Sequence, residues 1–300
     1  FTLSVTGEDA VDTELIWNLM SGMVSPYAGG LASYAISAID LALWDLKGKL
    51  LAQPVYELLG GPTRDHIDCY ATGNDTDWII ELGFAATKIA CPFGPADGAQ
   101  GLDDNEAFVA ATRALIGADR DLMVDCWMAF DVDYAVAYAE RMRRYRLRWI
   151  EDCLMPDDLN GVRALRERLP DHGLAGGEHW YSPAPFASAA DTRSLDVFQP
   201  DIGWACGLTG FLKIAEIAQT ANIPVMLHAG MNTAYGQHFT YAVPNATMGE
   251  FFLGSAPGVP LDEVRLTPGT PVPNGGRVIP SDAPGFGLAL TLEQVHALAV

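Results

Sequence analysis

Short apolar segments alternate with amphipathic helical patterns from residue 66 to residue 252, and this rhythm constrains the fold more than any other feature of the chain. Helical patterns at Asn105–Ile116, Tyr134–Arg144, Gly161–Leu169 and Leu208–Thr220 separate strand-like runs. Eight strands joined by helices are typical of a closed parallel barrel. The eight runs cover residues 66–71, 86–90, 122–126, 148–152, 174–178, 197–201, 224–228 and 247–252.

An open, doubly wound parallel sheet is the alternative arrangement of the same elements. In its dinucleotide-binding form, a glycine-rich phosphate loop follows the first strand. No such loop follows residues 66–71, so the barrel is the favoured prediction.

The regions that flank the rhythm predict a second, smaller domain. Residues 8–24 are typical of a short helix with acidic residues in its first turn. A longer helix is predicted over 32–51, because its apolar residues recur every three or four positions. Residues 255–300 are rich in proline and glycine and are expected to fold back onto the N-terminal helix. The predicted division is a capping remnant at 1–28, a barrel at 29–254 and a returning segment at 255–300.

Charge and cysteine content exclude several classes of protein. A formal net charge of −20 argues against a nucleic-acid partner, because phosphate binding needs a basic surface. Five cysteines without a CxxC motif indicate reduced thiols and a cytoplasmic protein. No apolar run reaches the roughly 18 residues that span a bilayer, so no membrane partner is predicted. The start at Phe1, without an initiator methionine or a basic signal region, leads us to expect a longer native protein.

Polar side chains stand at the carboxyl ends of five successive strand candidates, separated by 23 to 27 residues. Each separation is about one strand–helix unit. In a parallel barrel these strand ends meet at one mouth, where catalytic residues gather. We therefore expect the following residues to lie close together: Asp125, Glu151, Glu178, Asp201 and His228.

The three carboxylates Asp125, Glu151 and Glu178 predict one magnesium site. Converging carboxylates repel one another unless a cation neutralises them. Hard oxygen ligands without a cysteine or histidine set favour Mg²⁺ over Zn²⁺. Asp152 directly follows Glu151, and alternation along a strand predicts that it points to the opposite side. By the same reasoning, Cys126 and Cys153 are interpreted as packed residues.

His228 and Asp201 end neighbouring strands and predict an acid–base pair, because a carboxylate fixes the imidazole tautomer and raises its basicity. Three further residues are candidates for catalysis or substrate binding. Lys88, near the end of the second strand, could act as an opposing base or steady a developing anion. His179 could reach the substrate, and Glu250 could hydrogen-bond an enolate oxygen.

A set of motifs is spread along nearly the whole chain from about residue 8. The motifs are ASYAISAIDLALWDLKGKLLAQPVYELLGG (32–61), GPADG (94–98), MVDCW (123–127), WIEDCLMPDD (149–158), GGEH (176–179), QPDIGWACGLT (199–209), EFF (250–252), PVPNGGR (271–277) and PGFGL (284–288). Together these motifs resemble the mandelate racemase/muconate lactonizing enzyme group of the enolase superfamily, and within it the rhamnonate dehydratase subgroup.

The resemblance implies a (β/α)₇β barrel of the TIM type with an α+β capping domain made from both termini. It implies Mg²⁺ on the three carboxylates, and Asp201 and His228 as the acid–base dyad. The implied activity is that of a carbon–oxygen lyase, a hydro-lyase. It would dehydrate a rhamnonate-like acid sugar to a 2-keto-3-deoxy acid through α-proton abstraction and an enediolate. The family also implies a homo-oligomer.

The chain departs from the family pattern in three places. Lys88-Ile89-Ala90 keeps one lysine where many relatives carry Lys-x-Lys, which disfavours a racemase with two bases. The loop after His228 contains the apolar Met231, so contacts to the distal end of the substrate are expected to differ. Related chains would have several dozen residues before Phe1, including a specificity loop of the cap. Two alternatives stay open: an epimerase or cycloisomerase of the same group, and a non-catalytic barrel that acts as a binding or structural subunit.

Overall fold

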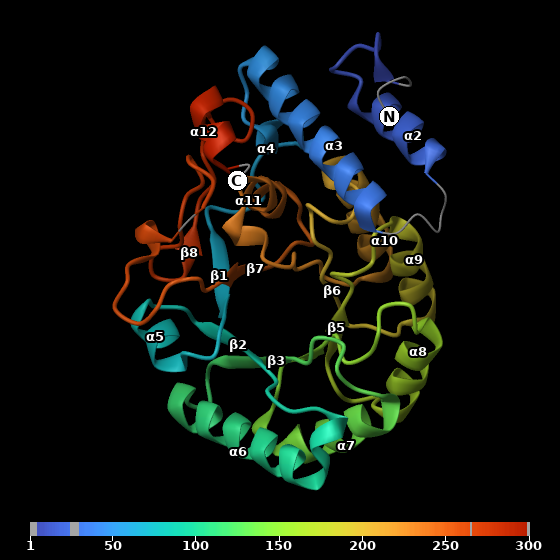
Figure 1. Ribbon diagram of the computed structural model, residues 1–300, viewed down its shortest axis with the longest axis vertical. Coiled ribbons are helices and arrows are strands. Elements are labelled where there is room, and N and C mark those ends of the chain that lie inside the picture. The colour runs from blue at the N-terminus through green and yellow to red at the C-terminus, as the bar shows by residue number, and fades with distance from the viewer. Residues whose placement is uncertain (1–4, 25–29, 265, 299–300) are drawn as a thin grey trace.

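The computed structural model describes residues 5–24, 30–264 and 266–298. Its centre is a curled sheet with the strand order β6-β5-β4-β3-β2-β1-β7, in which all these neighbours are parallel. Figure 1 shows these strands arranged as a ring. The strands are β1 (Ile67–Thr72), β2 (Ala86–Ala90), β3 (Asp121–Asp125), β4 (Ile150–Glu151), β5 (Leu174–Gly176), β6 (Val197–Phe198) and β7 (Gly249–Phe252).

A single residue closes the ring between β6 and β7. Val225 forms parallel bridges to Phe198 on one side and to Ala246 on the other. The strand expected at 224–228 is therefore reduced to the two bridges of Val225 and is too short to be numbered among the strands. With this position counted, eight parallel strand positions complete a (β/α)₇β barrel, and the fold predicted from the sequence is confirmed.

A helix follows each of the first seven strand positions and covers the outside of the ring (Figure 1). Asp131 and Asp158 cap two of them, accepting hydrogen bonds from the backbone N–H groups of Tyr134 and Gly161. The helices are α5 (Thr76–Glu81), α6 (Gly98–Ile116), α7 (Val132–Met142), α8 (Leu159–Arg168), α9 (Pro183–Thr192), α10 (Gly207–Ala221) and α11 (Ala234–Ala242). Short 3₁₀ turns lie at Pro95–Asp97 (η1), Arg143–Tyr145 (η2), Gly230–Asn232 (η3) and Leu261–Glu263 (η4).

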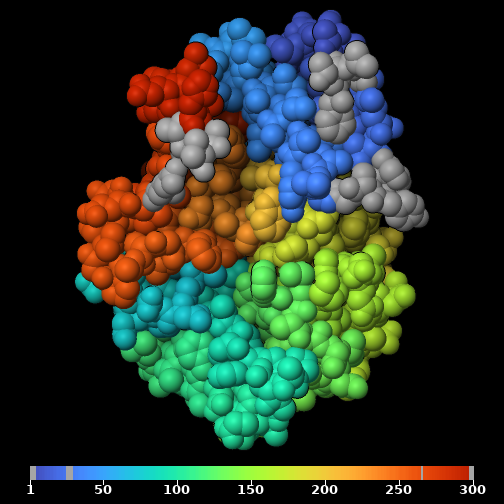
Figure 2. Space-filling view, in the orientation of Figure 1, coloured from blue at the N-terminus to red at the C-terminus, as the bar shows by residue number. Residues whose placement is uncertain are grey.

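Elements from the first and last parts of the chain lie outside the ring of strands (Figure 1). These are α2 (Thr13–Met23), α3 (Gly30–Leu51) and α4 (Val55–Leu58) from the first part, and β8 (Arg277–Val278) and α12 (Leu292–Leu298) from the last. In Figure 2 the blue first part and the red last part share the upper end of the molecule. Backbone hydrogen bonds join them, because Val55 N–H donates to Gly285 O over 2.8 Å and Gly285 N–H donates to Gln53 O over 3.0 Å.

The inside of the barrel is built in layers by strand alternation. One layer is apolar and buried, and it includes Ala86, Met123 and Trp149 from three adjacent strands. Side chains two residues apart in a strand share a face, so the next inward-facing residues after these three are, in the same order, Lys88, Asp125 and Glu151. The apolar layer is therefore the floor of a charged site at the carboxyl ends of the strands.

Within the described residues, we find no helix that is both long and apolar enough to cross a membrane.

Gly48 of α3 sets the close approach of that helix to the C-terminal segment. A Cβ atom at Gly48 would lie 2.6 Å from Gly285 Cα and 2.8 Å from Gln53 O, and neither backbone atom can yield. We expect Gly48→Ala to lower the free energy of unfolding by about 1–3 kcal/mol through overpacking, although alanine is the better helix former. Gly22→Ala in α2 is the control, because nothing lies within 4 Å of that Cβ position. Urea denaturation of both variants measures the difference, and a Gly48→Ala protein as stable as the parent would contradict the close contact.

Candidate active site

Lys88 lies at the centre of the charged layer and is fully buried. Its Nζ contacts Glu151 Oε1, and it lies 2.9 Å from Glu250 Oε1 and 3.9 Å from Asp125 Oδ2. Burial by itself lowers the pKa of this ammonium, but the charges of Glu151 and Glu250 outweigh it and hold the pKa well above its ordinary value. Lys88 therefore keeps its proton, which fits a residue that steadies negative charge rather than a base.

The three predicted metal ligands are carboxyls whose pKa values are all raised. Burial raises the pKa of Glu151 to about 8, with a further contribution from the charge of Asp125. Burial also raises the pKa of Glu178 to about 8, and that of Asp125 above its ordinary value. The charge of Asp125 also acts on Glu178, so the three groups share one electrostatic environment. Buried, mutually repelling oxygen donors are a set that a hard divalent cation fits.

Two of these carboxylates, those of Glu151 and Asp125, are held by hydrogen bonds from their neighbours. Glu151 Oε2 accepts hydrogen bonds from Trp149 Nε1 over 3.0 Å and from Gln199 Nε2 over 2.6 Å. Asp125 Oδ1 accepts one from Trp127 N–H over 2.9 Å. These contacts fix the direction of the carboxylates, and a donor set of this kind is oriented before any ligand binds.

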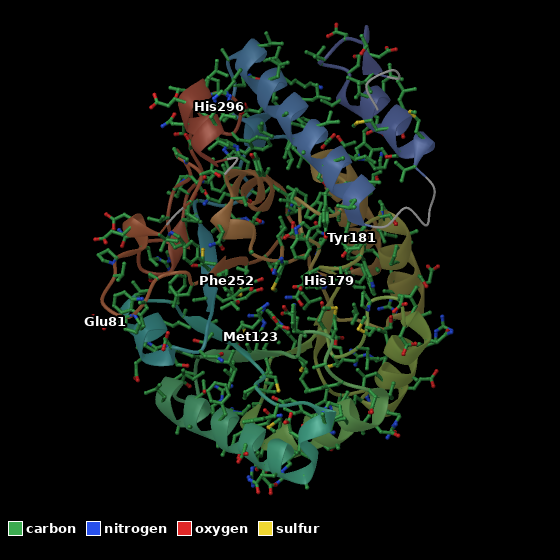
Figure 3. All side chains as sticks on the ribbon, viewed as in Figure 1. Glu81, Met123, His179, Tyr181, Phe252 and His296 are labelled. Atoms are coloured by element: carbon green, nitrogen blue, oxygen red, sulfur yellow. The ribbon has the colours of Figure 1, made fainter. Side chains whose placement is uncertain are left out.

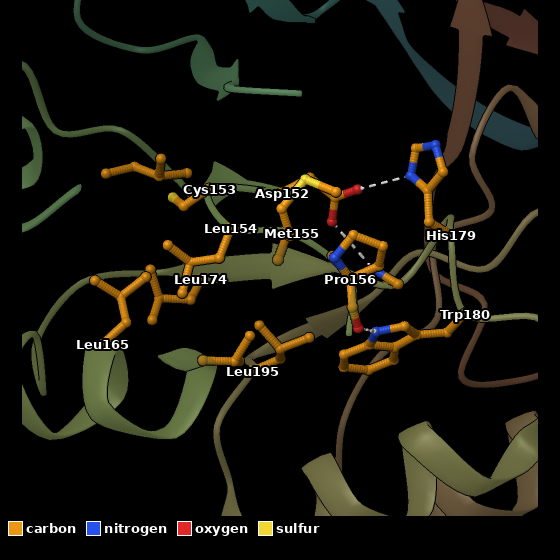
Figure 4. A pocket seen from close by; sticks show the side chains of 15 residues that line it. Asp152, Cys153, Leu154, Met155, Pro156, Leu165, Leu174, His179, Trp180 and Leu195 are labelled. Atoms are coloured by element: carbon orange, nitrogen blue, oxygen red, sulfur yellow. Dashed lines mark hydrogen bonds and ion pairs between the residues drawn. The ribbon is translucent and has the colours of Figure 1, made fainter. Parts of the chain in front are cut away.

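Asp152 joins this site, and the expectation that it points away is wrong. One potential ligand atom from each of Asp152, Glu178 and His179 lies within 4.8 Å of the others. Asp152 has a φ of 41°, so the chain leaves the strand after Glu151 and side-chain alternation no longer applies. Asp152 Oδ1 accepts from Gly177 N–H over 3.2 Å, and Oδ2 lies 3.4 Å from His179 Nδ1. Figure 4 shows Asp152 and His179 facing each other at the edge of a small cavity.

His228 and Asp201 are brought together as the sequence led us to expect. His228 Nδ1 lies 2.8 Å from Asp201 Oδ2, and the other ring nitrogen, Nε2, lies 3.4 Å from Glu178 Oε2. Burial lowers the pKa of His228, but the hydrogen bond to Asp201 and the charges of Glu250 and Glu178 outweigh it and raise the pKa to about 9. A pKa of about 9 keeps most of His228 protonated at neutral pH, and the positive charge of a cation held beside Glu178 would lower this pKa toward the range that suits a general base.

Glu250 is the counter-ion of Lys88 on β7. Its carboxylate accepts from Thr72 Oγ1 and, over 3.0 Å, from Ala229 N–H. Burial opposes its ionisation, but the charges of Lys88 and His228 outweigh it and lower the pKa of Glu250 to about 2.

Trp204 is a residue of the site that the sequence interpretation missed. Its ring centroid lies 5.2 Å from that of His228 and 5.5 Å from that of His179, so one indole touches both imidazoles. Its backbone N–H also donates to Asp201 Oδ1 over 3.1 Å. Its position three residues after Asp201, in the same loop, is the signal that could have identified it. In Figure 3, His179 lies toward the inside of the ring of strands.

Met231 does not face the site. It is fully buried, and a Cβ at Gly249 would lie 2.4 Å from its side chain, so the residue belongs to the core behind β7. A cavity of about 720 Å³ opens elsewhere, beside His179, between α2, α3 and the loops after β4 and β5. Its lining is mostly apolar and includes Trp17, Ile36 and Tyr181.

Two family models match the chain. Residues 3–60 match the mandelate racemase/muconate lactonizing enzyme N-terminal domain, and residues 76–295 match the enolase C-terminal domain-like family. An L-rhamnonate dehydratase from Saccharopolyspora erythraea is 39% identical over 294 residues, which are 96% of this chain and 75% of the relative.

Solved structures agree with these matches. The L-rhamnonate dehydratase from Gibberella zeae superposes with a TM-score of 0.90 at 36% identity, covering 96% of this chain and 74% of that one. A further structure of the Gibberella zeae enzyme, described as complexed with Mg, also has a TM-score of 0.90 at 36% identity, covering 97% of this chain and 72% of that one. The 3,6-anhydro-D-galactonate cycloisomerase from Zobellia galactanivorans has a TM-score of 0.82 at 30% identity, covering 97% and 83%. The chain therefore belongs to the mandelate racemase/muconate lactonizing enzyme group of the enolase superfamily and, within it, to the rhamnonate dehydratase subgroup.

Proposed function

We propose that this protein is a carbon–oxygen lyase that dehydrates an acid sugar, a rhamnonate-like aldonate, to a 2-keto-3-deoxy acid with Mg²⁺ as cofactor. One observation carries the proposal: the imidazole of His228, bonded to Asp201, faces a group of buried carboxyls with raised pKa values. The similarity to L-rhamnonate dehydratases over 96% of the chain supports the same reaction type.

In the proposed reaction, His228 Nε2 takes the proton from the carbon next to the substrate carboxylate, while Asp201 holds Nδ1 and stabilises the imidazolium. The electron pair of the broken C–H bond enters the carboxylate as an enediolate. When the C3–O bond breaks, the imidazolium returns its proton to the departing hydroxyl, which leaves as water. The enol that results tautomerises to the 2-keto-3-deoxy acid.

The residues that would hold one Mg²⁺ are Asp125, Glu151 and Glu178. The ion would supply positive charge beside the substrate carboxylate, which favours loss of the neighbouring proton. Lys88 adds a fixed positive charge to the same layer, and Glu250 balances it. His179, at the edge of the large cavity, would contact substrate hydroxyls.

An epimerase, racemase or cycloisomerase is the second candidate, because the Zobellia galactanivorans relative is a cycloisomerase at 30% identity. Racemisation through two bases needs a second proton acceptor opposite His228. Lys88 is buried among carboxylates and retains its proton, which argues against that role. A non-catalytic barrel is the candidate of another class, and the intact contact between His228 and Asp201 argues against it.

A screen of the protein with Mg²⁺ against a library of aldonic and related acid sugars tests the proposal. Semicarbazide detects the 2-keto-3-deoxy product. We expect a hit that disappears in EDTA and returns with added Mg²⁺. Turnover that resists EDTA would contradict the metal-dependent mechanism, and Mg²⁺ binding without any hit would shift the proposal to the epimerase. A homo-oligomeric state and a cytoplasmic location stay predictions.

A further inference from the structure

Ser33 is a buried hydroxyl on α3 that contacts two loops of the active site. Its side chain is only 5% exposed. Its Oγ contacts Trp204 O in the loop after β6 and lies 2.9 Å from Tyr181 O in the loop after β5. It also accepts a hydrogen bond from Cys206 N–H over 3.1 Å. One side chain thus joins a helix outside the barrel to the loops that follow Glu178 and Asp201.

The hydrogen bonds around Ser33 form a closed and satisfied set. A serine hydroxyl has one proton and can serve only one carbonyl at a time. The thiol of Cys206 lies 3.2 Å from Tyr181 O and can donate to it. The hydroxyl proton of Ser33 is then free for Trp204 O, while Cys206 N–H occupies a lone pair of Ser33. Trp204 O and Cys206 N–H are both satisfied in this set only when the hydroxyl of Ser33 is present.

Trp204 connects this set to the chemistry. Its carbonyl is bonded to Ser33, its N–H is bonded to Asp201, and its ring touches the imidazoles of His228 and His179. Tyr34, next to Ser33 on α3, also lies against this ring, with centroids 6.1 Å apart. A shift of the Trp204 backbone would therefore move the indole ring against which the imidazoles of His228 and His179 pack.

We propose that Ser33 is a positioning residue that acts through Trp204 to hold His228 and His179 in their working orientation. This inference rests on the proposed function, because it assigns a purpose to the geometry of that site. Ser33 touches no group that reacts. Its effect is to fix the two loops relative to α3, and a displacement of about 1 Å at a reacting group costs on the order of 100-fold in rate.

Ser37 provides a matched control on the same helix. The side chains of both serines are buried. The hydroxyl of Ser37, however, donates its proton to the backbone carbonyl of Ser33 within α3, over 2.9 Å. Ser37→Ala and Ser33→Ala therefore remove the same atom from the same helix. Only Ser33→Ala removes the hydroxyl that bonds Cys206 N–H and Trp204 O.

The test measures kcat, KM and amide hydrogen exchange for both variants, using the acid sugar that the wild-type protein turns over. We expect Ser33→Ala to lower kcat by about tenfold or more with a smaller change in KM. Exchange should accelerate in the peptide that contains Cys206. Ser37→Ala should keep kcat within about threefold and leave that peptide protected. A folded Ser33→Ala protein with the kcat of Ser37→Ala would overturn the proposal, as would unchanged exchange at Cys206.

Trp204→Ala keeps the test decisive if Ser33→Ala does not fold, because it removes the ring but not the backbone that Ser33 holds. We expect the same loss of kcat with exchange at Cys206 unchanged, and wild-type kcat in this variant would contradict a path through Trp204. The exchange measurement does not need a substrate. If the wild-type protein turns over no acid sugar, the proposed function fails, while protection at Cys206 still decides whether Ser33 holds the loops.

Discussion

His228→Asn should lower kcat by about 10³-fold or more, because general acid–base catalysis by a positioned side chain contributes about 10²–10⁴-fold and this residue acts in two steps. Asparagine keeps a polar side chain but cannot accept the α-proton or return it to the leaving hydroxyl. The loss should be in kcat, measured with the substrate found in the screen.

The same variant should still bind Mg²⁺, since His228 is not among the proposed ligands. Isothermal titration calorimetry of the variant with MgCl₂ checks this. His66→Asn is the matched control, because His66 directly precedes β1 and, within the described part of the chain, its ion-pair partner is Asp68, over 3.3 Å. A His228→Asn protein that loses Mg²⁺ binding would show that the residue belongs to the metal site and not to an acid–base dyad.

Glu178→Gln should weaken Mg²⁺ binding by at least about tenfold. The amide keeps the shape of the side chain and removes one of the anionic oxygens that Mg²⁺ prefers. Calorimetry measures the dissociation constant directly, and an unchanged constant would remove Glu178 from the ligand set.

Asp152→Asn is the informative companion, because Asp152 lies in the same group as Glu178 and His179. We expect it to weaken Mg²⁺ binding less than Glu178→Gln does. The reverse order would move the metal from Asp125, Glu151 and Glu178 to the side of the site that holds Asp152.

The barrel and the convergence of its strand ends could be predicted because both depend on local periodicity. A spacing of about one strand–helix unit predicts that Asp201 and His228 lie side by side, and the structure places Asp201 Oδ2 2.8 Å from His228 Nδ1. Alternation within a strand also explains why the side chain of Lys88 points into the barrel, because Lys88 lies two residues beyond the inward-facing Ala86. These features follow from backbone geometry that the sequence repeats.

The features that escaped prediction depend on a single dihedral angle or on contacts distant in sequence. Asp152 turns into the site because its φ is positive, and nothing in the residues beside it signals that. The seventh strand is reduced to the bridges of Val225 to Phe198 and Ala246, and the apolar run at 224–228 does not indicate this reduction. Ser33 contacts Trp204 across 171 residues of sequence, so no local pattern could indicate the bond.

The proposed activity consists of removing the α-proton of an acid sugar and expelling its 3-hydroxyl. The most direct measurement is nuclear magnetic resonance of the reaction in D₂O with Mg²⁺, using the substrate identified by the screen. We expect a 2-keto-3-deoxy acid with solvent deuterium at C3, and no product in EDTA. An intact acid that carries deuterium at C2 would contradict it and indicate an epimerase, and a substrate unchanged by the enzyme would contradict catalysis altogether.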